Sequence, residues 1–228
     1  VEADCYSCTY RTRGICAALR LGTGEERARP TFAIHRPRAI VARTRSSRSH
    51  LTILCEGYAV KFHLLADGRK QNLSFRVPAH LVLGIGALVE DRDLLALSLT
   101  DVRVALITKK DFLRYAYTSQ RTSWQLSRKF AAEHSDALDL MVALGRQDAA
   151  GRIAHILLKV ARKTLSEQRG DLIVIPMPMT QEDIADFTGL TTAHVNRTLG
   201  QMRRDGIIEY RERMLVIKDV DRMKQWAQ

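Results

Sequence analysis

Residues 179–206 carry the clearest pattern of apolar and polar positions in the chain, and the pattern predicts two short helices joined by a tight turn. Thr180 stands three residues before Asp183, which approximates a capping box at the start of the first helix. Gly189 fits a turn that requires a positive φ, and Thr191 can cap the second helix. The apolar positions at helical spacing are Ile184, Ala185 and Phe187, then Val195, Leu199 and Met202.

The second helix has a polar side, which the core spacing predicts to face outward. Its positions are Ala193, His194, Asn196, Arg197, Gly200, Gln201 and Arg204. Arginine pairs with the O6 and N7 atoms of guanine, and asparagine pairs with adenine. A helix of this kind, following a tight turn, is typical of a helix-turn-helix that enters the major groove of double-stranded DNA.

Two further apolar runs follow, at residues 207–210 and 214–217, and they predict a β-hairpin beside the two helices. Arg211 and Arg213 fall at its tip, where they could reach phosphates. The sequence therefore predicts a winged helix-turn-helix rather than a helical hairpin with an exposed charged face. The predicted DNA-contacting residues are Thr180, Thr191, Thr192, His194, Asn196, Arg197, Gln201 and Arg204.

Upstream, residues 31–110 show the alternation expected of short strands. Period-two patterns occur at 51–57, 58–62 and 101–107, and Ala66-Asp67-Gly68 is a hairpin signal. Several short strands at this spacing predict a roll or a sandwich.

A helical period replaces the alternation from Lys109 to about Gly145, and an amphipathic helix follows over residues 152–163. The first stretch contains a seam of heptad type, which suits pairing with a second copy of the helix. The seam residues are Ala131, His134, Leu138 and Met141. The alternative is that this helix packs only on its own roll.

Composition narrows the function. The chain has 228 residues, a net charge of +11 and a pI near 9.9, which favour an acidic polymer or surface as partner. No run of 18 apolar residues is present, and residues 1–4 lack a signal-sequence pattern, so the expected location is cytoplasmic, with no membrane partner. No catalytic triad, phosphate loop or His-Glu metal motif is visible, so an enzyme is not expected. A basic protein of the membrane surface is a further alternative, but here the basic residues accompany the predicted helix-turn-helix.

The order of β-roll, long helix and winged helix-turn-helix resembles the CRP/FNR superfamily of bacterial transcription regulators. The resemblance covers nearly the whole chain and is strongest at residues 65–71, 144–146 and 179–206, where the last stretch is similar to FNR and FixK proteins. It implies an α+β fold: an N-terminal β-roll of the cyclic-nucleotide-binding jelly-roll type, a long dimerisation helix and a C-terminal winged helix-turn-helix. The expected segments are a Cys-containing segment at 1–20, the β-roll sensor at 21–110, the dimerisation helix at 111–146 and the DNA-binding domain at 147–228.

The same resemblance implies a homodimer that reads a palindromic promoter site, with RNA polymerase as a further partner. The base-contacting arginine of the family matches Arg197. The family's glutamate is replaced by Ala193 and its serine by Asn196, so an acceptor for a cytosine amino group is lost. The preferred DNA sequence should therefore differ from the FNR-type TTGAT half-site at that step.

The sensor residues also depart from the family pattern. Cyclic-AMP binders of the family use a glutamate and a later Arg-Ser or Arg-Thr, but Ile85 stands where the glutamate belongs and no Arg-Ser follows. Arg92 is the only basic residue nearby, and it lies among acidic residues. A cyclic phosphate would lack its fork-shaped partner, which argues against cyclic AMP.

The spacing Cys5-x2-Cys8-x7-Cys16 looks like the N-terminal cluster of FNR-type oxygen sensors. In those proteins a fourth cysteine completes the ligands of a [4Fe–4S] centre, and it aligns here with Ala105. Cys55 is the fourth cysteine of the chain. It lies at even spacing from Leu51 and Ile53 on the same predicted strand, so it is expected to point into the roll as a small apolar residue.

Three roles for the cysteines stay open on the sequence. Cys5, Cys8, Cys16 and Cys55 could hold a [4Fe–4S] cluster, which would make the protein responsive to oxygen or redox state. The thiols could instead be vestigial or redox-reactive, or they could bind zinc. With vestigial cysteines and no cofactor, the protein would be a regulator that works without an effector.

Overall fold

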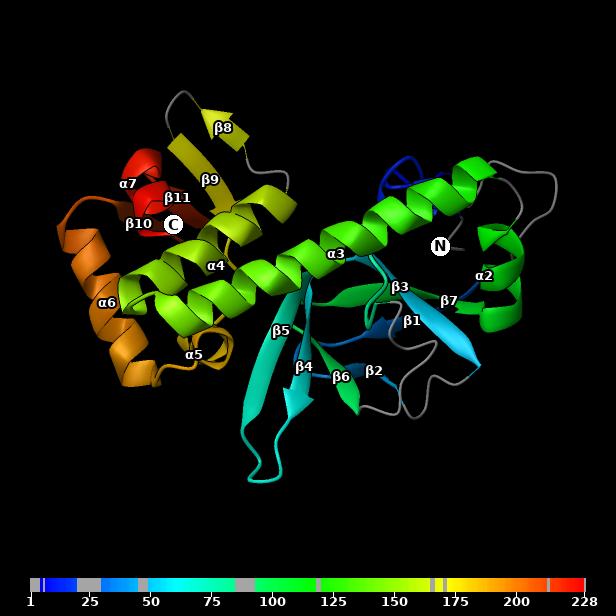
Figure 1. The fold of residues 1–228 in the computed structure, drawn as a ribbon, viewed down its shortest axis with the longest axis horizontal. Coiled ribbons are helices and arrows are strands. Elements are labelled where there is room, and N and C mark those ends of the chain that lie inside the picture. Colours follow the sequence, from blue (N-terminus) through cyan, green and yellow to red (C-terminus); the bar gives the residue numbers. More distant parts are fainter. Residues whose placement is uncertain are drawn as a thin grey trace. The chain divides into compact units, whose positions relative to one another are not determined.

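The computed structural model describes residues 5, 7–19, 30–44, 49–84, 93–117, 120–164, 167–169 (backbone only), 172–212 and 214–227. Ile85 and Arg92, which the cyclic-AMP argument uses, lie outside these residues, as does Arg213 of the predicted wing tip. The chain forms two compact units, Val1–Ser135 and Asp136–Gln228 (Figure 1). The division falls inside a long helix, and the four predicted domain segments remain predictions.

The first unit is built around two antiparallel sheets. One has the strand order β1-β7-β3 and the other β2-β6-β4-β5. The strands are β1 (Thr31–His35), β2 (Ile40–Arg43), β3 (His50–Glu56), β4 (Ala59–Leu64), β5 (Lys70–Arg76), β6 (Leu94–Ser98) and β7 (Val102–Thr108). The predicted hairpin turn joins β4 to β5, where Gly68 has a φ of 85° and Gly68 N donates to the Leu65 carbonyl.

Strand β3 differs from the predicted alternation, because Leu51, Thr52, Ile53 and Leu54 are all buried. Residues 79–82 pair with the edge of β3 that β7 leaves free, with Val82 N donating to Thr52 O and Leu54 N donating to His80 O. Leu51, Ile53 and Leu54 all belong to the apolar core of the roll.

The short helix α1 (Gly14–Ala18) is attached to the same segment. Ile15 N donates to Ala79 O at 2.8 Å, and Ala79 N donates to Leu54 O at 2.8 Å. Gly14 has a φ of +53°, and a Cβ there would lie 2.1 Å from the Ala79 carbonyl oxygen, so only glycine permits this close approach. Ile15, Ala18 and Leu19 join the core of the roll.

The predicted long helical segment consists of two helices, α2 (Lys109–Ala116) and α3 (Gln120–Arg146). Thr108 caps α2 by accepting from Asp111 N, and Tyr117 follows as its C-cap. Leu126, Leu140 and Ala143 of α3 are buried. None of the described helices is long and apolar enough to cross a membrane.

The second unit combines the end of α3 with four further helices and a small sheet of order β10-β11-β9-β8. Its elements are α4 (Ala149–Lys163), β8 (Glu167–Arg169), β9 (Leu172–Pro176), α5 (Gln181–Thr188), α6 (Thr192–Arg204), β10 (Ile208–Arg211), β11 (Met214–Ile217) and α7 (Val220–Trp226). The helices α4, α5 and α6 pack on one another through buried residues such as Ile153, Leu157, Ile184 and Leu199. The predicted α+β fold, with an N-terminal roll, a long helix and a winged helix-turn-helix, is confirmed.

Candidate functional site

The turn between α5 and α6 has the geometry that the sequence predicts. Thr180 and Asp183 form a reciprocal capping box: Asp183 N donates to Thr180 Oγ1 at 3.2 Å, and Thr180 N donates to Asp183 Oδ2 at 2.8 Å. Gly189 ends α5 in the left-handed region with a φ of +66°, and Thr191 caps α6 by accepting from His194 N. Two capped helices around a left-handed glycine hold the start of α6 in a defined direction.

Helix α6 has one buried and one exposed side. Val195, Leu199 and Met202 are at most 3% exposed, as their spacing predicts. Gly200 differs from the prediction of an outward position and is buried. The Arg204 side chain lies beside it, with Nη1 3.5 Å from the place of a glycine Cβ, and Arg204 Nη2 donates to Gln201 Oε1.

The predicted DNA-contacting residues of α6 differ in exposure and in their hydrogen-bond partners. Thr192, Asn196, Arg197, Gln201 and Arg204 are exposed, and His194 is half-buried. Within the described part of the chain, the Arg197 guanidinium has no hydrogen-bond partner, whereas Gln201 joins Arg204 to Asp205. Asn196 Nδ2 donates to Gln181 Oε1 of α5 at 3.0 Å, a contact that the sequence pattern did not reveal. Arg197 is thus an exposed cation whose donors are available to a partner.

A hollow of about 780 Å³ lies beside α6, and it is lined in part by Asp148, Ala149 and Ala150 at the start of α4. Asp148 caps α4 through a bond from Gly151 N at 2.8 Å. Arg203 also lines the hollow and is exposed. The sequence pattern does not reveal this juxtaposition, since nothing in residues 148–150 indicates which helix they approach. A helix N-terminus next to arginines is a surface that favours phosphate.

The wing is the β10–β11 hairpin, and Arg211, the described arginine of its tip, is engaged within the protein. Arg211 Nε donates to Glu209 Oε1 at 2.8 Å, and Lys218 Nζ lies 2.5 Å from Glu209 Oε2. These two hydrogen-bonding cations lower the pKa of the Glu209 carboxyl to about 2. Arg211 therefore already has an anionic partner, and a phosphate would compete with Glu209 for it.

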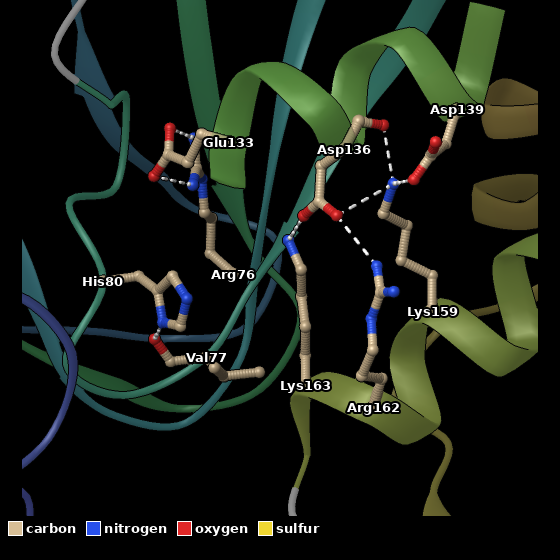
Figure 2. A network of polar contacts seen from close by, with 9 residues as sticks. All are labelled: Arg76, Val77, His80, Glu133, Asp136, Asp139, Lys159, Arg162 and Lys163. Carbon is tan, nitrogen blue, oxygen red and sulfur yellow. Dashed lines mark hydrogen bonds and ion pairs between the residues drawn. The ribbon is translucent and has the colours of Figure 1, made fainter. Parts of the chain in front are cut away.

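Two carboxylates of α3 make the ion pairs shown in Figure 2. In the first unit, Glu133 binds Arg76 through two bonds of 2.8 and 3.3 Å, and the Arg76 side chain is 1% exposed. Burial raises the pKa of Glu133, but the positive charge and hydrogen bonds of Arg76, with help from Lys61, bring it below its usual value. Glu133 is thus the anion that permits the guanidinium to be buried.

In the second unit, Asp136 accepts from three cations of α4: Lys159 at 3.1 Å and Arg162 and Lys163 at 2.9 Å each (Figure 2). Burial raises the pKa of Asp136, but Lys163 and Lys159 outweigh burial and lower it below its usual value. Lys159 also donates to the backbone carbonyl of Asp136 at 2.6 Å. This cluster fixes α4, the first helix of the unit that carries α6, to the end of α3.

The predicted seam lies on the exposed side of α3. Ala131, His134, Leu138 and Met141 are all exposed, and Leu138 and Met141 have exposed fractions of 48% and 68%. Trp124, seven residues before Ala131, is 65% exposed on the same stripe. A helix that exposes this many large apolar side chains along one stripe has an unfilled packing surface.

Cys55 packs against the apolar core of the roll, as its parity with Leu51 and Ile53 predicts, and Cys16 packs against the same core. A β-bulge between Leu54 and Glu56 interrupts the pairing of β3 at Cys55, and the Cys55 side chain is half-buried. Ala79 connects the strand of Cys55 to the helix of Cys16. Its N–H donates to the carbonyl of Leu54, the neighbour of Cys55, and its carbonyl accepts from the N–H of Ile15, the neighbour of Cys16.

Burial raises the pKa of Cys16 to about 12, and the nearby thiols of Cys55, Cys8 and Cys5 add to the shift. Burial and the thiols of Cys5 and Cys8 likewise raise the pKa of Cys55 to about 12. The raised pKa values favour the protonated thiol, which is a weaker nucleophile than the thiolate. Among the described residues, no group of three or more His, Cys, Asp or Glu side chains is arranged to hold a metal ion as it stands.

A roll, a long helix with an exposed apolar stripe and a winged helix-turn-helix with an available arginine define a DNA-binding transcription regulator. The comparisons with known proteins agree. A family model described as a Crp-like helix-turn-helix domain matches residues 151–226. The nitrogen fixation regulation protein FixK of Bradyrhizobium diazoefficiens is 30% identical over 206 residues, covering 90% of this chain and 85% of that protein.

The transcriptional activator protein FnrL of Cereibacter sphaeroides is 26% identical over 231 residues, covering 98% of this chain and 91% of FnrL. The structure of FixK2 from Bradyrhizobium japonicum superposes with a TM-score of 0.73 at 24% identity, covering 88% of this chain and 98% of FixK2. The chain belongs to the CRP/FNR family of transcription regulators, a non-enzymatic class of DNA-binding proteins, with FixK-type and FnrL-type activators among its relatives.

Proposed function

We propose that the protein is a homodimeric regulator that places two copies of α6 in successive major grooves of a palindromic promoter site. The observation that carries the proposal is Arg197, an exposed arginine without a hydrogen-bond partner in the described part of the chain, at the centre of a capped helix. Half-sites of such operators lie about 34 Å apart, so binding depends steeply on the pose of the two helices. RNA polymerase is the expected partner of a regulator bound at a promoter.

The exposed stripe on α3 supports the homodimer. Leu138, Met141 and Trp124 present apolar side chains at heptad-like spacing, and a second copy of α3 offers a matching surface. A two-fold dimer also gives the two half-sites of a palindrome identical readers.

Arg197→Ala tests the reading of DNA. We expect specific operator binding to weaken by roughly 10- to 100-fold, since a bidentate arginine discriminates by about 1–3 kcal/mol. Arg121→Ala, a change of equal charge at an exposed position of α3, should leave the ratio of specific to non-specific binding unchanged. Equal losses in the two variants would indicate that only net charge matters and would sink the assignment of α6.

For the sensor, we propose that Cys5, Cys8, Cys16 and Cys55 are the residues that hold a [4Fe–4S] cluster. Four soft thiol ligands suit such a cluster in kind and number. When bound, the cluster would supply a group sensitive to oxygen and redox state. Thiols must lose their protons to bind it, and the raised pKa values of Cys16 and Cys55 make this step dependent on the metal for those two.

The test is an anaerobic visible spectrum of freshly purified protein together with iron and sulfide assays. Iron and sulfide near four each per chain, lost in Cys5→Ala and in Cys55→Ala, would support the four-thiol assignment. A content that Cys55→Ala leaves unchanged would exclude Cys55 as a ligand.

The alternative is a regulator without an effector, in which the cysteines are vestigial and the abundance of the protein sets promoter occupancy. The observations in its favour are Ala105 at the place of the family's fourth cysteine and the missing cyclic-nucleotide residues in the sequence. Specific DNA binding by protein free of iron, at the same affinity as iron-containing protein, would favour this alternative; binding only after reconstitution would reject it.

A further inference from the structure

We propose that Gln181 of α5 is a specificity-determining residue, which fixes the orientation of the Asn196 amide and thereby the base that Asn196 reads. The inference rests on the proposed reading of DNA by α6. Its basis is the hydrogen bond from Asn196 Nδ2 to Gln181 Oε1, at 3.0 Å, between residues that lie 15 positions apart.

Both residues stand on firmly placed backbone. Gln181 is the first residue of α5, directly after the Thr180 cap, and Asn196 lies in the second turn of α6, after the Thr191 cap. The left-handed Gly189 joins the two helices. Asn196 is exposed and Gln181 is half-buried, so the amide of Asn196 faces solvent while its partner is anchored beside the turn.

The chemistry of an amide gives this contact a consequence. Asparagine reads adenine with two bonds: Oδ1 accepts from the N6 amino group, and one Nδ2 hydrogen donates to N7. The other Nδ2 hydrogen points sideways, where it can donate to Gln181. While Gln181 accepts that hydrogen, the donor and the acceptor of the outer edge of Asn196 keep one order.

A rotation of the Asn196 amide by 180° would reverse that order and would no longer match adenine in the same place. With the Gln181 amide in its present orientation, the rotation would also bring Oδ1 against Gln181 Oε1, which places two acceptors together. Gln181 therefore acts through Asn196 as a positioning residue, and its effect should appear in base preference rather than in overall affinity.

Three substitutions separate the possibilities. Glutamate at position 181 can only accept, so Q181E should hold the Asn196 amide in its present orientation. Leucine neither donates nor accepts, so Q181L should release the amide. Lysine can only donate, so Q181K should bind Asn196 Oδ1 and favour the reversed orientation.

The experiment uses the full chain. Duplexes that bind the unaltered protein are selected from a randomised pool, and the affinities of the selected operator and of its single-base-pair variants are then compared. We expect the unaltered protein to prefer adenine at one position of each half-site by about 10-fold. Q181E should keep that preference, Q181L should reduce it to less than about 3-fold and Q181K should abolish or invert it. Added or removed charge shifts binding to all sequences alike, so the readout is the ratio between sequences.

Asn196→Ala should remove the same preference at the same position, and Gln225→Leu, the same chemical change on an exposed part of α7, should leave it intact. Thermal unfolding of each variant establishes that it is folded. An unchanged preference in Q181L, or equal behaviour of Q181E and Q181K, would overturn the inference while leaving the proposed function standing. If the unaltered protein selects no sequence, the proposed function fails and this inference fails with it.

Discussion

At the scale of single residues, the most constrained group is the buried guanidinium of Arg76. Its charge has a single bidentate carboxylate partner, Glu133, and the Arg76 Nε has no hydrogen-bond partner in the described structure. A buried charge that loses its partner costs far more than a broken surface pair. The same unit also contains a surface ion pair, between Glu56 and Arg103, in which Glu56 is largely exposed.

Glu133→Ala should lower the free energy of unfolding by about 3 kcal/mol, because it leaves Arg76 buried and unpaired. Glu56→Ala, the matched control, should change it by less than about 1 kcal/mol. Urea denaturation of the two variants at neutral pH gives both values. Equal effects of the two substitutions would contradict the burial argument.

Asp136 contributes to the loss of unfolding free energy that is expected at acidic pH. Its pKa in the folded protein lies below the value of an unfolded aspartate, so its ionised form stabilises the fold. That contribution is fully present above the unfolded value of about 4 and is lost as the pH falls through the lower folded value. Asp136→Asn should therefore flatten the decline of unfolding free energy between pH 6 and pH 3.

Urea denaturation across this range measures the slope. Asp221→Asn, which changes an exposed carboxylate of α7, should run parallel to the unaltered protein. A slope unchanged by Asp136→Asn would show that the three cations of α4 do not stabilise the folded state through this carboxylate.

At the scale of elements, the angle between α5 and α6 depends on the single left-handed residue Gly189. An L-residue with a side chain pays about 1–2 kcal/mol in this conformation. Gly189→Ala should therefore destabilise the second unit by about 1 kcal/mol, and Gly189→Asn should recover part of the loss because asparagine tolerates the left-handed region.

Chemical denaturation followed by circular dichroism compares the three proteins. The order of stability should be glycine, asparagine, alanine. An alanine variant as stable as the unaltered protein would mean that the turn relaxes to another conformation, and its operator affinity would then reveal whether α6 has moved.

At the scale of the whole molecule, the proposed homodimer uses the exposed stripe of α3. Leu138→Glu places a charge in the centre of that stripe, so we expect a monomer and a loss of operator binding of at least about 100-fold, because two half-sites no longer share one molecule. Sedimentation equilibrium and electrophoretic shifts with whole and half operators measure both effects.

Ala132→Glu, at an exposed position outside the stripe, should leave the mass and the binding unchanged. A Leu138→Glu protein that retains the mass of a dimer would place the subunit interface elsewhere. A monomer in both variants would show that any added charge on α3 prevents association.

Local sequence patterns were enough to predict the helix-turn-helix of α5 and α6. Caps, a glycine turn and apolar positions at steps of three and four concern residues within one or two helical turns of each other, and each was observed at Thr180, Gly189 and Val195. Gly200 was the exception, because its burial depends on a neighbouring arginine side chain. The DNA contacts and the seam pairing predicted from these patterns remain predictions.

The sequence by itself determined the order of elements and the two sides of α6, because backbone preference and apolar spacing act over short distances along the chain. Only the tertiary structure decided what depends on distant segments meeting. Ala79 links the helix of Cys16 to the strand of Cys55 through its bonds with Ile15 and Leu54, Glu133 met Arg76, and Gln181 met Asn196. Such pairings depend on the register and packing of the folded chain, which spacing along a single element does not specify.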